Sequence, residues 1–141
     1  MSVTYTTTLG NSRLQLVNDL VASKTVAAST GGATAGQLVI GTASLSGSTG
    51  VLATIALVTT GTAGGPFNTP SSKVLTLAGV PLSATATATG TAALAEFRNN
   101  AGTTVASGLT VGTSGTDIIL NSTAISSGQT VQITAGTITH P

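Results

Sequence analysis

The residues that could do acid–base or metal chemistry are few and widely spaced along this 141-residue chain. The three carboxylates are Asp19, Glu96 and Asp117, the one histidine is His140, and cysteine is absent. Paired acid–base catalysis needs two carboxyl groups close together, and nothing in the sequence brings these together. A catalytic triad would have to use a histidine next to the end of the printed sequence, where chains tend to fray. We therefore expect no enzymatic activity and no cofactor.

A metal site is not expected either, because one histidine, no thiolate and three scattered acids make no compact ligand set. The carboxylates instead suit structural roles. Asp19 is expected on the polar side of a helix, Glu96 on a strand beside Phe97, and Asp117 at a turn position that opens a strand.

Basic residues are equally sparse, being Arg13, Lys24, Lys73 and Arg98, with one tyrosine available for stacking. Nucleic-acid binders neutralise phosphates with clustered lysine and arginine. The glycine-rich stretch at 60–67 lacks the lysine of a phosphate-binding loop. We expect no direct binding to nucleic acid.

The composition is dominated by uncharged residues. Charged residues make up 5% of the chain, against about a quarter in ordinary globular proteins, and the formal net charge is +1. The mean hydropathy of +0.47 and the many β-branched residues argue against disorder. Free monomers usually stay dispersed by means of mixed surface charge. A surface of threonine, serine, asparagine and glycine therefore favours association, and we expect the protein to belong to an assembly.

The helical pattern occurs once, near the N-terminus. Leu14, Val17, Leu20 and Val21 recur at three- and four-residue spacing, with Asn11 or Ser12 available as N-cap. We expect this helix to end near Ser23 or Lys24, before a loop at 25–36 that is rich in small residues.

The rest of the chain predicts short strands with glycine, serine or proline between them. Residues 83–98 read as one long strand with a bend at Gly90, and the residues from Asn99 to Gly102 suit a hairpin turn. The other expected strands lie at 37–42, 51–59, 73–79, 103–111, 117–121 and 130–139.

This spacing, without alternating helices, predicts a mainly β fold. The expected fold is an antiparallel β-sandwich or jelly roll of about seven to eight strands with one short N-terminal helix. Residues 1–10 are expected to form an extended arm, and residues 11–141 a single domain.

The arm supplies the candidate partner-binding residues. Residues 2–8 are almost all β-branched or aromatic, so Val3, Tyr5 and Thr7 could add a strand to a neighbouring subunit. An ordinary edge strand within the same subunit is the alternative. Arg98 could pair with Glu96 of a neighbouring chain or with Asp117, or could be a solvated strand end.

Two stretches carry a resemblance to a known family. TTTLGNSRLQLVNDLV near the start and the sequence from ATGTAALAEFRNNAGTT to the Thr-rich end resemble small proteins encoded in the structural gene clusters of tailed bacteriophages. The resemblance is weakest between residues 25 and 80. It implies a virion protein, and among virion roles a capsid decoration (cement) protein that binds the major capsid protein, often as a homo-trimer.

Three other functions stay open at this stage. They are a tail or fibre protein, a carbohydrate-binding module on the particle, and, formally, a hydrolase built on Asp117 or Glu96. The sequence lacks a basic, apolar signal segment and any stretch near the roughly 20 apolar residues of a membrane span. We expect synthesis in the host cytoplasm, a final location on the capsid surface, and no membrane association.

Overall fold

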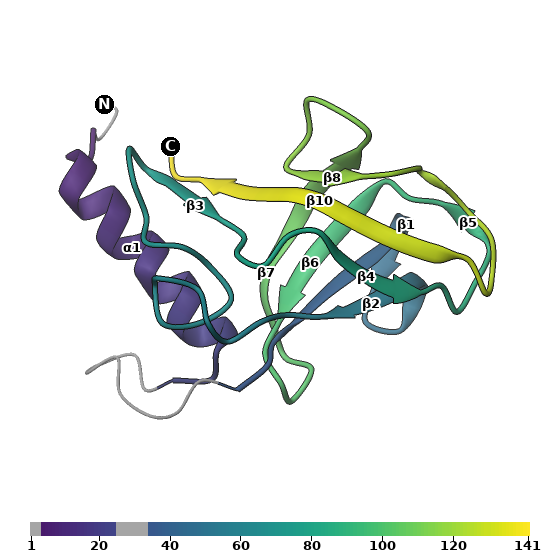
Figure 1. Cartoon of the computed structure of the whole chain (residues 1–141). Helices are drawn as coiled ribbons and strands as arrows, with labels where there is room; N and C mark the ends of the chain where they lie inside the picture. The colour runs from purple at the N-terminus through teal and green to yellow at the C-terminus, as the bar shows by residue number, and fades with distance from the viewer. Residues whose placement is uncertain (1–3, 25–33) are drawn as a thin grey trace.

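A computed structural model describes residues 4–24 and 34–141 of the chain (Figure 1). The chain is mainly β with one helix near the N-terminus, as the sequence predicted. The elements are α1 (Thr7–Val21), β1 (Gln37–Ser46), β2 (Thr49–Ala56), β3 (Val74–Thr76), β4 (Leu82–Thr85), β5 (Gly90–Thr91), β6 (Leu94–Arg98), β7 (Thr104–Gly112), β8 (Ile118–Leu120), β9 (Ala124–Ile125) and β10 (Thr130–Thr139).

The helix starts earlier than the sequence indicated. Thr6 is the N-cap, and its hydroxyl accepts a hydrogen bond from the backbone N–H of Leu9 at 3.2 Å. The expected extended arm over residues 1–10 is therefore wrong from Thr7 onward. The run of β-branched residues suggested a strand, but threonine also caps helices well because its oxygen satisfies an N–H of the first turn. Asn11, expected as a cap, lies inside the helix and accepts from the backbone N–H of Lys73.

The long strand expected over residues 83–98 is also wrong, because the chain forms β4, β5 and β6 in its place. After β4 the backbone changes partner. The N–H of Ala86 donates to Gln129 O, and the N–H of the next residue, Thr87, donates to Leu52 O in β2 at 2.8 Å. This break is one reason why the described residues hold ten strands where seven or eight were expected.

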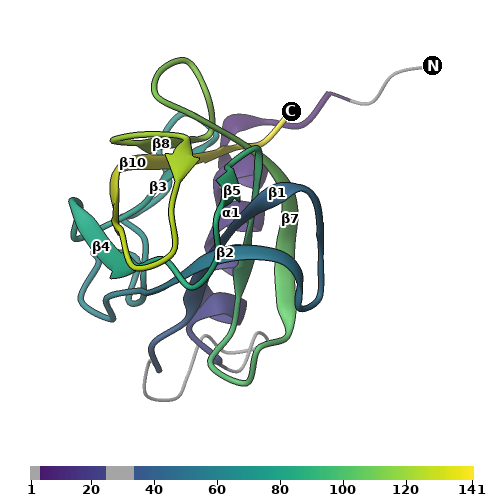
Figure 2. The ribbon, with the colours of Figure 1, turned by 90° about the vertical axis from the view of Figure 1, so that its right-hand side faces the viewer.

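Eight of the strands form one large sheet that curls around the core. The strand order is β2-β1-β6-β7-β8-β10-β3, and β4 also pairs with β10. Neighbours are antiparallel except β7 and β8, which are parallel over two residue pairs. The bond from Thr87 to Leu52 connects the segment after β4 with β2, at the opposite end of the order. The two halves of the sheet therefore face each other across the core (Figures 1 and 2).

The β6–β7 hairpin confirms the turn predicted between Asn99 and Gly102. The backbone N–H of Asn99 donates to Thr103 O, and that of Gly102 donates to Asn99 O. Gly102 has a φ of +86°, a conformation that residues with a Cβ rarely adopt. The hairpin holds β6 in the middle of the sheet, where its side chains reach the core.

One hydrophobic cluster joins the helix to both halves of the sheet. It contains Leu14 and Val21 of α1, Phe97 of β6 and Ile133 of β10. Phe67, from the long connection between β2 and β3, meets Phe97 edge to face with ring centroids 4.9 Å apart. Aromatic rings favour this arrangement because the positive ring edge meets the negative face. The connection is thus part of the core.

Replacing Phe67 with alanine should lower the free energy of unfolding by about 3–5 kcal/mol, because the ring is fully buried and its removal leaves a cavity. Urea denaturation followed by circular dichroism measures the change. Thr54→Ala, on the exposed face of β2, is the control and should change stability by less than about 0.5 kcal/mol. Equal stability of the two variants would contradict the place given to Phe67 in the core.

Candidate partner-binding surface

The side of α1 that faces the protein body carries polar residues as well as apolar ones. Asn18 and Asp19 are 0% and 1% exposed. The expectation that Asp19 lies on the polar, solvent-facing side of the helix is therefore wrong. Its Oδ1 accepts from Gln15 Nε2 at 3.0 Å and from Asn18 Nδ2 at 3.1 Å. A buried carboxylate needs such donors, because losing water without replacement bonds is unfavourable.

Asn18 connects the helix to the loop at 61–67. Its Nδ2 donates to Ala63 O at 3.0 Å, and its Oδ1 accepts from the backbone N–H of Phe67 at 3.2 Å. Gly65 lets the loop come this close, since a Cβ there would lie 2.8 Å from Asn18 Oδ1. The amide therefore satisfies backbone groups that the loop cannot pair within itself, and it fixes the rotation of α1 about its axis.

Because of this rotation, leucines face outward. Leu9, Leu16 and Leu20 are 43%, 39% and 43% exposed, and they are three of the four large hydrophobic residues exposed in the described chain. Leu20 was expected in the buried stripe with Leu14 and Val21, which are indeed buried. At 100° per residue, Leu9, Arg13, Leu16 and Leu20 fall on one side of the helix. We call these four residues the leucine seam.

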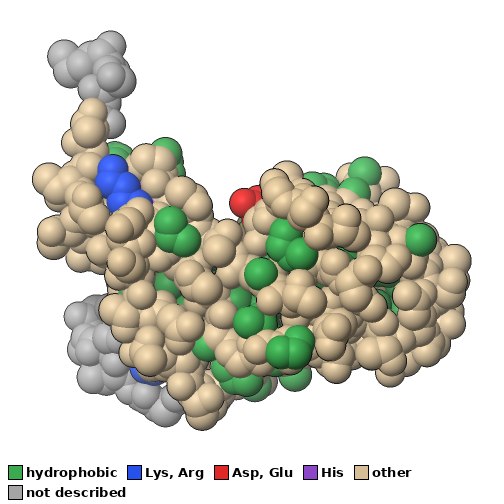
Figure 3. All heavy atoms as spheres, turned by 45° about the horizontal axis from the view of Figure 1, so that its top comes forward, with side chains coloured by type: hydrophobic (Ala, Val, Ile, Leu, Met, Phe, Trp, Pro, Cys, Tyr) green, Lys and Arg blue, Asp and Glu red, His purple; other side chains and the backbone are tan. Residues whose placement is uncertain are grey.

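The surface of the molecule holds little charge. In the view of Figure 3, uncharged tan atoms cover most of the molecule, with scattered green side chains and few coloured blue or red. Blue atoms lie over the end of the molecule that α1 forms. The exposed leucines Leu9, Leu16 and Leu20 are all residues of α1, and Arg13 is the cation among them.

The end of the helix where the seam begins is held by an aromatic cluster. The guanidinium carbon of Arg13 lies 3.9 Å from the ring centroid of Tyr5, a cation–π contact. Tyr5 also meets His140 in an edge-to-face arrangement at 5.6 Å. The backbone N–H of His140 donates to Lys73 O. Residues from both ends of the described chain thus meet beside the first turns of α1 and hold the Arg13 side chain in place.

The candidate residues of the arm have different environments. Val3 lies outside the described residues, so its predicted role stays a prediction. Tyr5 contacts its own chain through Arg13 and His140. Thr7 is the exposed first residue of α1 and is not part of a strand. Strand addition by residues 2–8 as a unit is therefore wrong for Thr7, whose backbone is helical.

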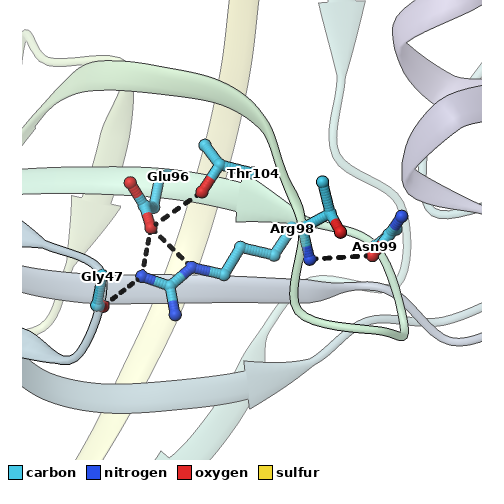
Figure 4. Close-up of polar contacts among 6 residues, drawn as sticks. Gly47, Glu96, Arg98, Asn99 and Thr104 are labelled. Carbon is cyan, nitrogen blue, oxygen red and sulfur yellow. Dashed lines mark hydrogen bonds and ion pairs between the residues drawn. The ribbon is translucent and has the colours of Figure 1, made fainter.

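Arg98 has a structural role within its own chain (Figure 4). It forms an ion pair with Glu96 of the same strand, with side chains 14% and 8% exposed. Its Nη2 also donates to Gly47 O, at 2.6 Å, in the turn between β1 and β2. Glu96 Oε1 accepts a further bond from Thr104 Oγ1 on β7. Of the alternatives considered for Arg98, a pair with Asp117 and a solvated strand end are both wrong.

Asp117 fastens the loop before β8, close to the turn role expected for it. Its Oδ2 accepts from the backbone N–H and the hydroxyl of Thr110, at 2.9 and 3.0 Å. The three carboxylates are thus engaged in three separate structural contacts, on α1, on β6 and in this loop.

Residues 4–24 and 34–141 contain no candidate for another kind of site. No pocket is present there. No group of three histidine, cysteine, aspartate or glutamate side chains in these ranges could hold a metal ion. In the same residues, no helix is long and apolar enough to cross a membrane.

Comparison with known proteins adds no neighbour, since no family model, no curated protein and no solved structure matches the chain.

The leucine seam is the surface feature that the sequence reasoning missed. With the helix started at Asn11, Leu9 fell outside it, and only one apolar stripe was visible. A start at Thr7 reveals the second stripe at four- and three-residue spacing.

Asn18→Ala should lower the free energy of unfolding by roughly 1–3 kcal/mol, because the buried N–H of Phe67 loses its acceptor and Asp19 loses a donor. Chemical denaturation measures the loss. Ser12→Ala, on the exposed side of the same helix, controls for the change in helix propensity and should be close to neutral. A neutral Asn18→Ala variant would show that the amide does not hold the loop.

Arg98→Ala should be more harmful, with a loss of about 3 kcal/mol, because it leaves the carboxylate of Glu96 buried without its cation. The double variant Glu96→Leu with Arg98→Leu removes both charges and should recover much of that loss. Thermal and urea unfolding of the wild type, the single variant and the double variant measure this. A double variant no more stable than Arg98→Ala would contradict the ion-pair explanation.

Proposed function

We propose that this chain is a structural protein of a tailed-bacteriophage particle, and that it binds the outside of the capsid as a decoration (cement) protein. The observation that carries the proposal is the leucine seam on a surface with almost no charge. Exposed apolar groups on one element of a charge-poor protein favour association. The resemblance of the two terminal stretches to phage structural proteins selects the kind of assembly.

The mechanism would be physical. Each copy covers a junction between capsid subunits and buries apolar and backbone polar surface there. Binding to the assembled shell alone stabilises that shell by mass action, and many copies resist the outward pressure of packaged DNA together. No step of this mechanism needs a catalytic residue or a cofactor.

Within the proposal, the partner is the major capsid protein, and the chain forms a homo-trimer where capsid subunits meet. The outer faces of the strands supply a surface for contacts between copies. On β4 and β10, Thr85 pairs with Thr130 and Ser83 with Gln132. Thr85, Thr130 and Ser83 are exposed. Such hydroxyl-rich surfaces can form hydrogen bonds between subunits without any charged side chain.

The test is the location and copy number of the chain in purified particles of the source virus. Quantitative gel staining and cryo-electron microscopy should find hundreds of copies on the shell. Particles that lack the chain should lose their DNA at a lower temperature than complete particles. A handful of copies in the tail would favour the tail or fibre function, and absence from particles would overturn a virion role.

A further inference from the structure

The leucine seam has the spacing of a helix-packing surface. Leu9, Arg13, Leu16 and Leu20 are separated by four, three and four residues, which is the alternation of the d and a positions of a heptad repeat. Three of the four positions are leucine. The stripe therefore fits a groove or a second helix, and Arg13 would lie inside the contact.

Arg13 sets a requirement on whatever covers the seam. Arg13 is an exposed residue, and its guanidinium lies against the Tyr5 ring and 3.5 Å from His140 Nε2, which limits its freedom before binding. A guanidinium always keeps its charge, and removing it from water without a counter-ion is strongly unfavourable. The covering surface must therefore present a carboxylate, or another anion, at this point among apolar side chains.

The leucine seam of a second copy does not meet that requirement. Asp19 is buried on the side of α1 that faces the protein body, Glu96 is paired with Arg98, and Asp117 lies in the loop before β8. None of these three carboxylates lies on the seam. Contact between two seams, in either orientation, would bury the Arg13 of each copy without a counter-ion.

The surface area that two seams could bury against each other leads to the same conclusion. Three leucines that are each about two-fifths exposed offer, with their partners in a second copy, roughly a few hundred Å² of buried surface. Stable interfaces bury about 1,200–2,000 Å². A groove that encloses the helix on both sides buries more surface for each leucine than a second exposed helix can.

We propose that the leucine seam inserts into an apolar groove containing a carboxylate on a different protein. If the chain decorates a capsid, as proposed above, that protein is the major capsid protein. The inference thus rests on the proposed function and names the surface that serves it. A lipid surface fits less well, because interfacial helices carry many lysines and arginines on their polar side, whereas Arg13 is the one basic residue of α1.

The experiment adds purified chain to capsids of the source virus that lack it, and measures bound protein by co-sedimentation. The variant Leu16→Gln with Leu20→Gln keeps helix propensity and changes side chains that are already exposed, so it should fold as the wild type does. It should bind capsids at least tenfold more weakly. Val80→Gln, at the exposed hydrophobic residue outside the helix, is the matched control and should bind normally.

The charge requirement is tested with Arg13→Glu and Arg13→Lys. Arg13→Glu should abolish binding through repulsion of the carboxylate, whereas Arg13→Lys should retain part of it. Thermal unfolding of each variant verifies that the fold is intact. If the leucine variant and Arg13→Glu both bind capsids as strongly as the wild type does, the seam inference is overturned and the proposed function still stands.

Other outcomes are equally distinct. Failure of the wild-type chain to bind capsids would overturn the proposed function and, with it, this inference. Light scattering that shows an oligomer of the wild type but a monomer of the leucine variant would assign the seam to a second copy. Seam-dependent binding to phosphatidylcholine–phosphatidylglycerol vesicles, without capsid binding, would assign it to a lipid surface.

Discussion

The contact between Asn18 and the 61–67 loop determines which side of α1 faces solvent. The amide bonds Ala63 O and the N–H of Phe67, and Gly65 allows the helix and loop to approach. Once these bonds form, Leu14 and Val21 lie in the core. Leu9, Leu16 and Leu20 then have no place inside. The hydrogen bonds that Asn18 makes inside the protein thus leave the leucines on the outer surface. The proposed interaction depends on those exposed leucines.

The few charged residues of the chain also contribute to the stability of the sheet. The ion pair of Glu96 and Arg98, with Thr104 and Gly47 as further partners, links β6 to β7 and to the β1–β2 turn. The described residues contain no buried side-chain nitrogen or oxygen without a partner. Elsewhere, strand pairing and the core supply the stability, since cysteine is absent from the chain. Glu96 and Arg98 thus make their ion pair within the fold, and few other charged residues remain for the surface.

The sequence predicted the elements whose signals are local. The strand over residues 130–139 and the Asn99–Gly102 turn are where periodicity and turn chemistry placed them. The errors occurred where a distant partner decides. Residues 83–98 alternate like one strand, but Ala86 and Thr87 bond Gln129 and Leu52, which no local pattern could indicate. Likewise, the buried Asn18 finds its partners in a loop more than forty residues further along the chain.

The position of β10 has a consequence for how the protein is made. This last strand pairs with β8, β4 and β3, which come from three separate parts of the chain. During synthesis these strands emerge from the ribosome first. Until residues 130–139 follow, β3 and β4 lack a strand partner, and β8 can pair only with β7. Contacts of such long sequence separation form slowly. The sheet can therefore close only late in translation, and nascent chains that stop short of β10 would expose unpaired edges open to aggregation.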